Sequence, residues 1–133
     1  MSEIDEAFAR AGGRWVTLGV ADLARSRAFY GGVLGLREMQ AGPTATIYDC
    51  GEMRLMIEAR PDHAVVRPGS PVVFKVDDIE RARRDLEKRG VWFTEPLAPA
   101  GTLGDLDLWT ASFLDPDGHP LALMVEVPKG FAP

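Results

Sequence analysis

The feature that most constrains the fold of this chain is an internal repeat, because the pattern of its first half recurs in its second half. The sequence Val-x-Asp-Leu-x-Arg at residues 20–25 matches Val-x-Asp-Ile-x-Arg at residues 76–81. Leu-Met-Ile-Glu at 55–58 likewise resembles Leu-Met-Val-Glu at 123–126. Self-similarity of this kind indicates a supersecondary unit that occurs twice. With 133 residues, the chain is therefore predicted to be one domain made of two similar modules.

Each half begins with a predicted strand and a predicted helix. Residues 14–20 and 72–76 are rich in β-branched and aromatic side chains, which favour strands. Asp22 and Asp78 follow these strands, and each carboxylate can accept hydrogen bonds from the free N–H groups of a first helical turn. Each helix is predicted to end near a glycine, which suits a helix C-terminus.

Three further strands are predicted to complete each module. The predicted fold is therefore α+β, with two tandem βαβββ modules that form a cupped mixed sheet. The strands are predicted at 36–40, 44–50 and 53–59 in the first half, and at 91–94, 108–114 and 119–127 in the second. The predicted segments are an N-terminal arm (1–13), a first module (14–60), a linker (61–70) and a second module (71–127). The long loop 95–108 is predicted to be either a lid or a dimer contact.

Charge and cysteine content argue against several classes of protein. The net charge is −5, which disfavours nucleic-acid binding and docking on an anionic membrane. No apolar stretch approaches the ~20 residues that a membrane-spanning helix needs. Cys50 is the only cysteine, so no disulfide can form within the chain, and a reducing compartment, the cytoplasm, is predicted.

Three segments together resemble one known superfamily. They are Val-Ala-Asp-Leu-Ala-Arg-Ser-Arg-Ala-Phe-Tyr at 20–30 with Val-Leu-Gly-Leu at 33–36, Val-Asp-Asp-Ile at 76–79, and Phe-Leu-Asp-Pro-Asp-Gly-His at 113–119. Over about residues 14–127 the chain is similar to glyoxalase, bleomycin-resistance and extradiol-dioxygenase proteins, the vicinal oxygen chelate superfamily. The resemblance implies paired βαβββ modules, a cavity in each paired sheet and, commonly, a homodimer.

The resemblance also implies a divalent metal, held by one residue from each of four strands. Counting from the shared segments, these positions are Trp15, Glu58, Pro71 and Ala122. Tryptophan, proline and alanine side chains offer no lone pair to such a cation, and one carboxylate does not make a catalytic site that needs three or four ligands. If the Leu-Met-x-Glu repeat sets the alignment instead, Glu126 replaces Ala122, and two ligands are still missing. The sequence therefore predicts neither a metal nor another cofactor.

Other catalytic centres find little support in the residues. His63 lies in the predicted linker, and His119 follows the turn at 115–118, which it is predicted to cap or hydrogen-bond. The two histidines are therefore not expected to bind a metal together. The sequence has no Gly-x-Ser-x-Gly motif, and Cys50 has no evident histidine partner for nucleophilic catalysis.

A binding pocket is predicted on the concave face of the sheet, because alternate residues of a strand share one face. An aromatic side chain, two methionines and a few charges would supply apolar area for affinity and polar groups for orientation. Trp15 offers a flat surface on which a planar or cationic molecule can stack. The predicted ligand-binding residues are Trp15, Thr17, Arg54, Met56, Glu58, Lys75, Trp92, Trp109, Ala122, Met124 and Glu126.

Three functions remain open at this point. The first is a metal-free protein that sequesters a small molecule, either an antibiotic, as resistance proteins of this superfamily do, or an aromatic metabolite. The second is a lyase, isomerase or dioxygenase of the same fold that uses Glu58 as a general base or an atypical divalent metal site. The third is a structural homodimer without a small ligand, in which Trp15 and Met56 fill the space of the metal.

Overall fold

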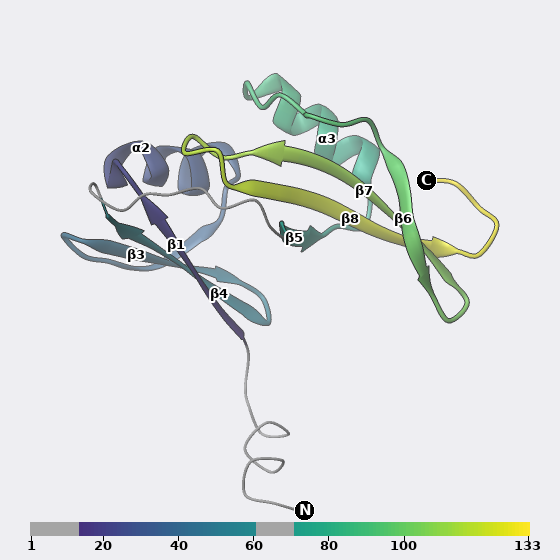
Figure 1. Ribbon diagram of the computed structural model, residues 1–133, viewed down its shortest axis with the longest axis horizontal. Coiled ribbons are helices and arrows are strands. Elements are labelled where there is room, and N and C mark those ends of the chain that lie inside the picture. The colour runs from purple at the N-terminus through teal and green to yellow at the C-terminus, as the bar shows by residue number, and fades with distance from the viewer. Residues whose placement is uncertain (1–13, 61–70) are drawn as a thin grey trace, which may run out of the picture.

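The computed structural model describes residues 14–60 and 71–133, which form an α+β fold with two four-stranded mixed sheets (Figure 1). This confirms the predicted fold class. The first module contains β1 (Arg14–Val20), α2 (Leu23–Arg27), the π-helix η1 (Ala28–Val33), β2 (Arg37–Ala41), β3 (Ala45–Cys50) and β4 (Met53–Ala59). The second contains β5 (Val72–Lys75), α3 (Ile79–Lys88), β6 (Ala98–Leu103), β7 (Leu106–Leu114) and β8 (Pro120–Pro128). The predicted arm 1–13, the linker 61–70 and His63 lie outside the described residues.

The two sheets have the same topology. The strand order is β1-β4-β3-β2 in the first sheet and β5-β8-β7-β6 in the second. The module's first strand runs parallel to its last strand in both cases, and the remaining neighbours are antiparallel. The internal repeat of the sequence therefore corresponds to a repeated βαβββ unit.

Both predicted helix caps form. The Asp22 carboxylate accepts a hydrogen bond from the Arg25 backbone N–H at 3.0 Å, and Asp78 accepts one from Arg81 N–H at 3.1 Å. The first helix then widens into η1, where Leu34 N–H donates to the Phe29 carbonyl at 2.8 Å. Glycines within η1 have a low helix propensity, which weakens the regular hydrogen-bond pattern there.

Two predictions about the second module are wrong. Residues 91–94 form no strand, because only Phe93 makes a bridge, to Phe113 of β7. The predicted loop 95–108 instead contains β6, which pairs with β7. Its proline, alanine and glycine residues disfavour strands, and Pro99 cannot donate a backbone hydrogen bond. Pairing with β7 overrides that local preference at the edge of the sheet, where a missing donor is tolerated.

Helices cover one face of each sheet and leave the other face open. Figure 1 shows α2 and α3 on the same side of the two sheets. The core lies beneath the helices, and alternate strand residues point away from it onto what we call the open faces. No helix within 14–60 and 71–133 is long and apolar enough to cross a membrane. The largest fully buried core side chains include Tyr30, Tyr48, Leu55, Ile57, Phe113 and Leu121.

Candidate functional site

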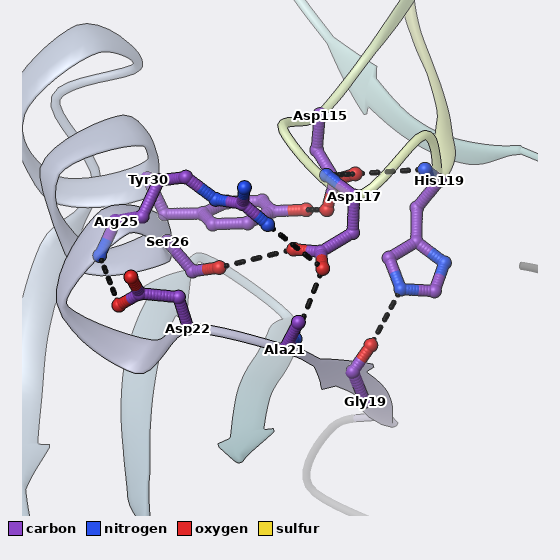
Figure 2. A network of polar contacts seen from close by, with 9 residues as sticks. All are labelled: Gly19, Ala21, Asp22, Arg25, Ser26, Tyr30, Asp115, Asp117 and His119. Carbon is purple, nitrogen blue, oxygen red and sulfur yellow. Dashed lines mark hydrogen bonds and ion pairs between the residues drawn. The ribbon is translucent and has the colours of Figure 1, made fainter. Parts of the chain in front are cut away.

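The turn between β7 and β8 connects the second module to the first. Figure 2 shows Asp115 at the start of this turn. The residue is almost fully buried. One carboxylate oxygen accepts from the Tyr30 hydroxyl at 2.7 Å. The other accepts from the backbone N–H groups of Asp117 at 2.9 Å and His119 at 2.7 Å. Because three donors satisfy this buried charge, Asp115 stabilises both its own turn and the contact with η1.

Asp117 and His119 extend the same junction to β1 and α2. One Asp117 oxygen accepts from Ala21 N–H at 2.9 Å and from the Arg25 guanidinium at 3.1 Å. The His119 ring lies 2.7 Å from the Gly19 carbonyl, and since a carbonyl only accepts, Nε2 carries the proton. His119 thus contacts the other module as well as its own turn (Figure 2). We assign this network a structural role, because its side chains bind one another.

The junction also makes the stability of the protein sensitive to alkaline pH. Burial, and then the charge of Asp115, raise the pKa of Tyr30 well above its ordinary value near 10. The unfolded chain therefore loses the phenolic proton first. The stability contributed by Tyr30 is complete below about pH 10 and is lost as the pH rises above it.

We expect Tyr30→Phe to remove this part of the pH dependence. The difference in free energy of unfolding between wild type and variant should narrow between about pH 9 and about pH 11. Urea denaturation at both pH values measures that difference. Tyr48, whose pKa is also raised by burial, is present in both proteins and so cancels. An equal difference at the two pH values would contradict the assignment to Tyr30.

Five predicted ligand-binding residues come together on the open face of the first sheet. The strand registers set them in three rows across β1, β4 and β3. Trp15 is 60% exposed and is available to a ligand. The rows are Trp15, Arg54 and Asp49; Thr17, Met56 and Ile47; and Gly19, Glu58 and Ala45.

Charged groups on this face are mostly paired. The Glu58 carboxylate lies 3.2 Å from the Arg60 guanidinium. The Asp49 carboxylate lies 3.5 Å from the Arg54 guanidinium and 3.8 Å from that of Arg37. Asp49 and Arg37 were missed by the sequence prediction, because only the cross-strand register places them beside Arg54.

Three other predicted residues, Lys75, Met124 and Glu126, lie on the open face of the second sheet. The Lys75 ammonium is 3.6 Å from the Glu126 carboxylate. All three line a groove of about 1850 Å³, which extends along β5 to the first module at Cys50 and Met53. Its volume exceeds the range of roughly 300–1,000 Å³ that is usual for a small-molecule pocket.

The remaining three predicted residues are not available on an open face. Trp92 is 81% exposed, but it lies in the loop after α3, where no strand forms. Trp109 pairs with Val125 on the covered face and packs against the core. Ala122 has the parity of the open face but is only 2% exposed. The structure therefore does not bring these three residues together with the others on an accessible face, because strand formation and burial depend on more than strand period.

The registers also correct the alignment of the two modules. Trp15 and Pro71 each lie seven residues before a helix cap, so Thr17 is equivalent to Val73. Thr17 pairs with Met56 and Val73 pairs with Ala122. Met56 is therefore the counterpart of Ala122. The likeness between Leu-Met-Ile-Glu and Leu-Met-Val-Glu is out of register by two residues, so the position equivalent to Ala122 is Met56 and not Glu58.

The residues at the corrected metal positions do not fit a divalent metal. They are Trp15, Met56, Pro71 and Ala122, and the methionine thioether is their only, weak, acceptor. Hard and borderline cations prefer carboxylate, imidazole and thiolate donors. Among the described residues, histidine, cysteine, aspartate and glutamate form no group of three or more that could hold a metal ion.

Comparisons with known proteins agree with this fold. Residues 14–123 match the model of the Glyoxalase/Bleomycin resistance protein/Dioxygenase superfamily. A glyoxalase/bleomycin resistance protein/dioxygenase from Alicyclobacillus acidocaldarius is similar in structure, with a TM-score of 0.69, 17% identity and coverage of 84% of this chain and 89% of that chain. A glyoxalase family protein from Enterococcus faecalis is also similar, with a TM-score of 0.66 and 24% identity. The match covers 82% of this chain and 93% of that chain.

A lactoylglutathione lyase from Agrobacterium tumefaciens is a further structural relative, with a TM-score of 0.62 and 16% identity. The match covers 84% of this chain and 91% of that chain. At these identities the structural likeness concerns the fold alone. No protein with a curated description matches this chain in sequence.

Proposed function

Because this chain belongs to the Glyoxalase/Bleomycin resistance protein/Dioxygenase superfamily, we propose that it binds a small, partly aromatic molecule without the help of a metal ion. The observation that carries the proposal is the replacement of donors at the metal positions by Trp15, Met56, Pro71 and Ala122. None of these side chains offers the donors that such a metal prefers, and at one of the positions the exposed Trp15 supplies apolar surface instead. An antibiotic or an aromatic metabolite has the matching chemistry.

The exposed aromatic surface of Trp15 supports a binding function over a purely structural one. An indole that is 60% exposed beside the apolar row of Met56 and Ile47 leaves a flat area for a ligand ring to cover. Glu58, the base of the alternative enzymatic function, is held in an ion pair by Arg60. A substrate proton would have to compete with that guanidinium for the carboxylate.

The proposed binding unit is a homodimer. A second copy that placed its second sheet opposite the first sheet of its partner would cover the open faces of both. The site would then take Trp15 from one protomer and residues such as Lys75 and Met124 from the other. This arrangement would also fill part of the groove, which is too large for one small molecule.

Trp15→Ala tests the proposal. In a thermal-shift screen over antibiotics, aromatic metabolites and divalent ions, at least one aromatic compound should raise the melting temperature of the wild type, because it binds the native state. We expect Trp15→Ala to weaken the affinity for that compound at least ~10-fold through loss of the stacking surface. Isothermal titration calorimetry on the purified proteins measures the change.

Trp92→Ala is the matched control, since it removes an exposed tryptophan that lies outside the open faces. Its affinity should equal that of the wild type. Light scattering on the same samples should give twice the chain mass of 14.5 kDa. A melting temperature raised by divalent ions and not by aromatic compounds, or equal affinities of the two variants, would refute metal-free binding at Trp15.

A further inference from the structure

We infer that the ligand is a planar aromatic anion whose ring stacks on Trp15 and whose anionic group binds the Arg54 guanidinium. This inference rests on the proposed binding function and specifies its ligand class. Trp15 and Arg54 are direct cross-strand partners in parallel register, so their side chains leave the same face next to each other. An aromatic plate beside a planar, two-pronged donor matches an aromatic carboxylate.

The contacts of Arg54 leave its guanidinium available. Its Nη1 is 3.5 Å from the Asp49 carboxylate and 3.5 Å from the Gly51 carbonyl, which are both long hydrogen bonds. The same Asp49 oxygen already accepts from the Gly51 backbone N–H at 3.0 Å, a shorter bond that closes the β3–β4 turn. An incoming carboxylate could therefore bind Arg54 with better geometry than its present partners.

The charge balance of the first sheet's open face also favours an anion. In the row that contains Trp15, Asp49 is shared by Arg54 and by Arg37 of β2, so two guanidinium groups face one carboxylate. Elsewhere on this face, Glu58 and Arg60 neutralise each other. The row beside Trp15 therefore carries a net positive charge, although the net charge of the whole chain is −5.

The same positive charge argues against the cationic ligand that an exposed tryptophan could otherwise stack. A cation over the Trp15 ring would lie beside the Arg54 guanidinium and would be repelled by it. A neutral aromatic molecule would leave the guanidinium without a new partner. Ligand charge thus discriminates between the three classes.

The test uses three probes of one shape, namely 2-naphthoate, 2-naphthamide and 2-naphthylmethylammonium, which are titrated calorimetrically into the full chain. We expect 2-naphthoate to bind about 10-fold more tightly than the amide, and the ammonium to bind weakest. The preference for the carboxylate should shrink when sodium chloride is raised from about 0.05 M to about 0.5 M, because salt screens exposed charges.

Substitutions of Arg54 test whether this residue causes the preference for the carboxylate. Arg54→Gln should weaken 2-naphthoate binding about 10-fold and leave 2-naphthamide unchanged, because only the charged hydrogen bond is lost. Arg54→Lys should keep part of the preference for the carboxylate over the amide, because lysine retains the positive charge but cannot form the bidentate hydrogen bond of a guanidinium. Arg84→Gln is the matched control, because Arg84 is an exposed arginine of α3 and does not lie on the open face of the first sheet. This variant should bind all three probes like the wild type.

The outcomes separate the ligand class from the proposed function. Equal binding of the acid and the amide, unchanged by Arg54→Gln but lost in Trp15→Ala, would overturn the anionic class and leave aromatic binding intact. Failure of all three probes and of the wider screen would overturn both. Thermal melts of each variant without probe check that the fold is retained.

Discussion

Asp115→Ala is expected to lower the free energy of unfolding by about 3–5 kcal/mol, because it empties the centre of the module junction. The Asp115 side chain accepts from the Tyr30 hydroxyl and from two backbone N–H groups of its own turn. Alanine would leave the buried Tyr30 hydroxyl and two partly buried N–H groups without this acceptor, and each unsatisfied donor destabilises the folded state. Urea denaturation at neutral pH measures the loss.

Asp85→Ala is the matched control for this experiment. Asp85 is an exposed aspartate of α3, so its replacement should change the free energy of unfolding by no more than about 0.5 kcal/mol. The double variant with Tyr30→Phe should be less destabilised than the sum of its parts, because the two side chains share a hydrogen bond. If Asp115→Ala and Asp85→Ala destabilise equally, the junction does not hold the modules together as described.

Phe113→Ala should destabilise the fold by a similar amount, about 3–5 kcal/mol, for an apolar reason. Phe113 is a fully buried residue of β7, and its ring centroid lies 5.3 Å from that of Phe93. Truncation removes the area buried by the ring and leaves a cavity that the rigid sheet cannot fully close. Chemical denaturation followed by circular dichroism measures the effect.

Its neighbour in the strand provides the control. Leu114 points to the opposite side of β7 and is about half exposed, so Leu114→Ala should cost less than about 1 kcal/mol. The contrast between two adjacent residues follows from the period of two in a strand. Similar losses for both variants would mean that β7 does not present these faces to core and solvent.

Much of the fold could be predicted because it depends on local patterns. The carboxylates of Asp22 and Asp78 cap helices by accepting a hydrogen bond from the backbone N–H three residues later. Any helix that begins with this sequence would form that contact. The repeat of strand, helix and three strands was likewise readable from periodicity and turn residues, as was the parity that collects Trp15, Arg54 and Met56 on one face.

Other features could not be predicted, because they depend on partners that are distant in sequence. Residues 98–103 form β6 only because β7 supplies its hydrogen bonds, against the preference of proline and glycine. The pairing of Thr17 with Met56, and of Val73 with Ala122, showed that the apparent match of the two Leu-Met-x-Glu segments is misleading. A shift of two residues preserves parity, so sequence pattern cannot detect it.

By itself, the amino-acid sequence determined the capped helices, the repeated module, the alternation of faces and the residue types tryptophan, proline and alanine at positions 15, 71 and 122. Only the tertiary structure decided the parallel registers, the packing of Trp109 against the core and the contact of Asp117 and His119 with the first module. The physical reason is range. Caps and strand period act over a few neighbouring residues, whereas register and module packing are selected by the free energy of the whole fold.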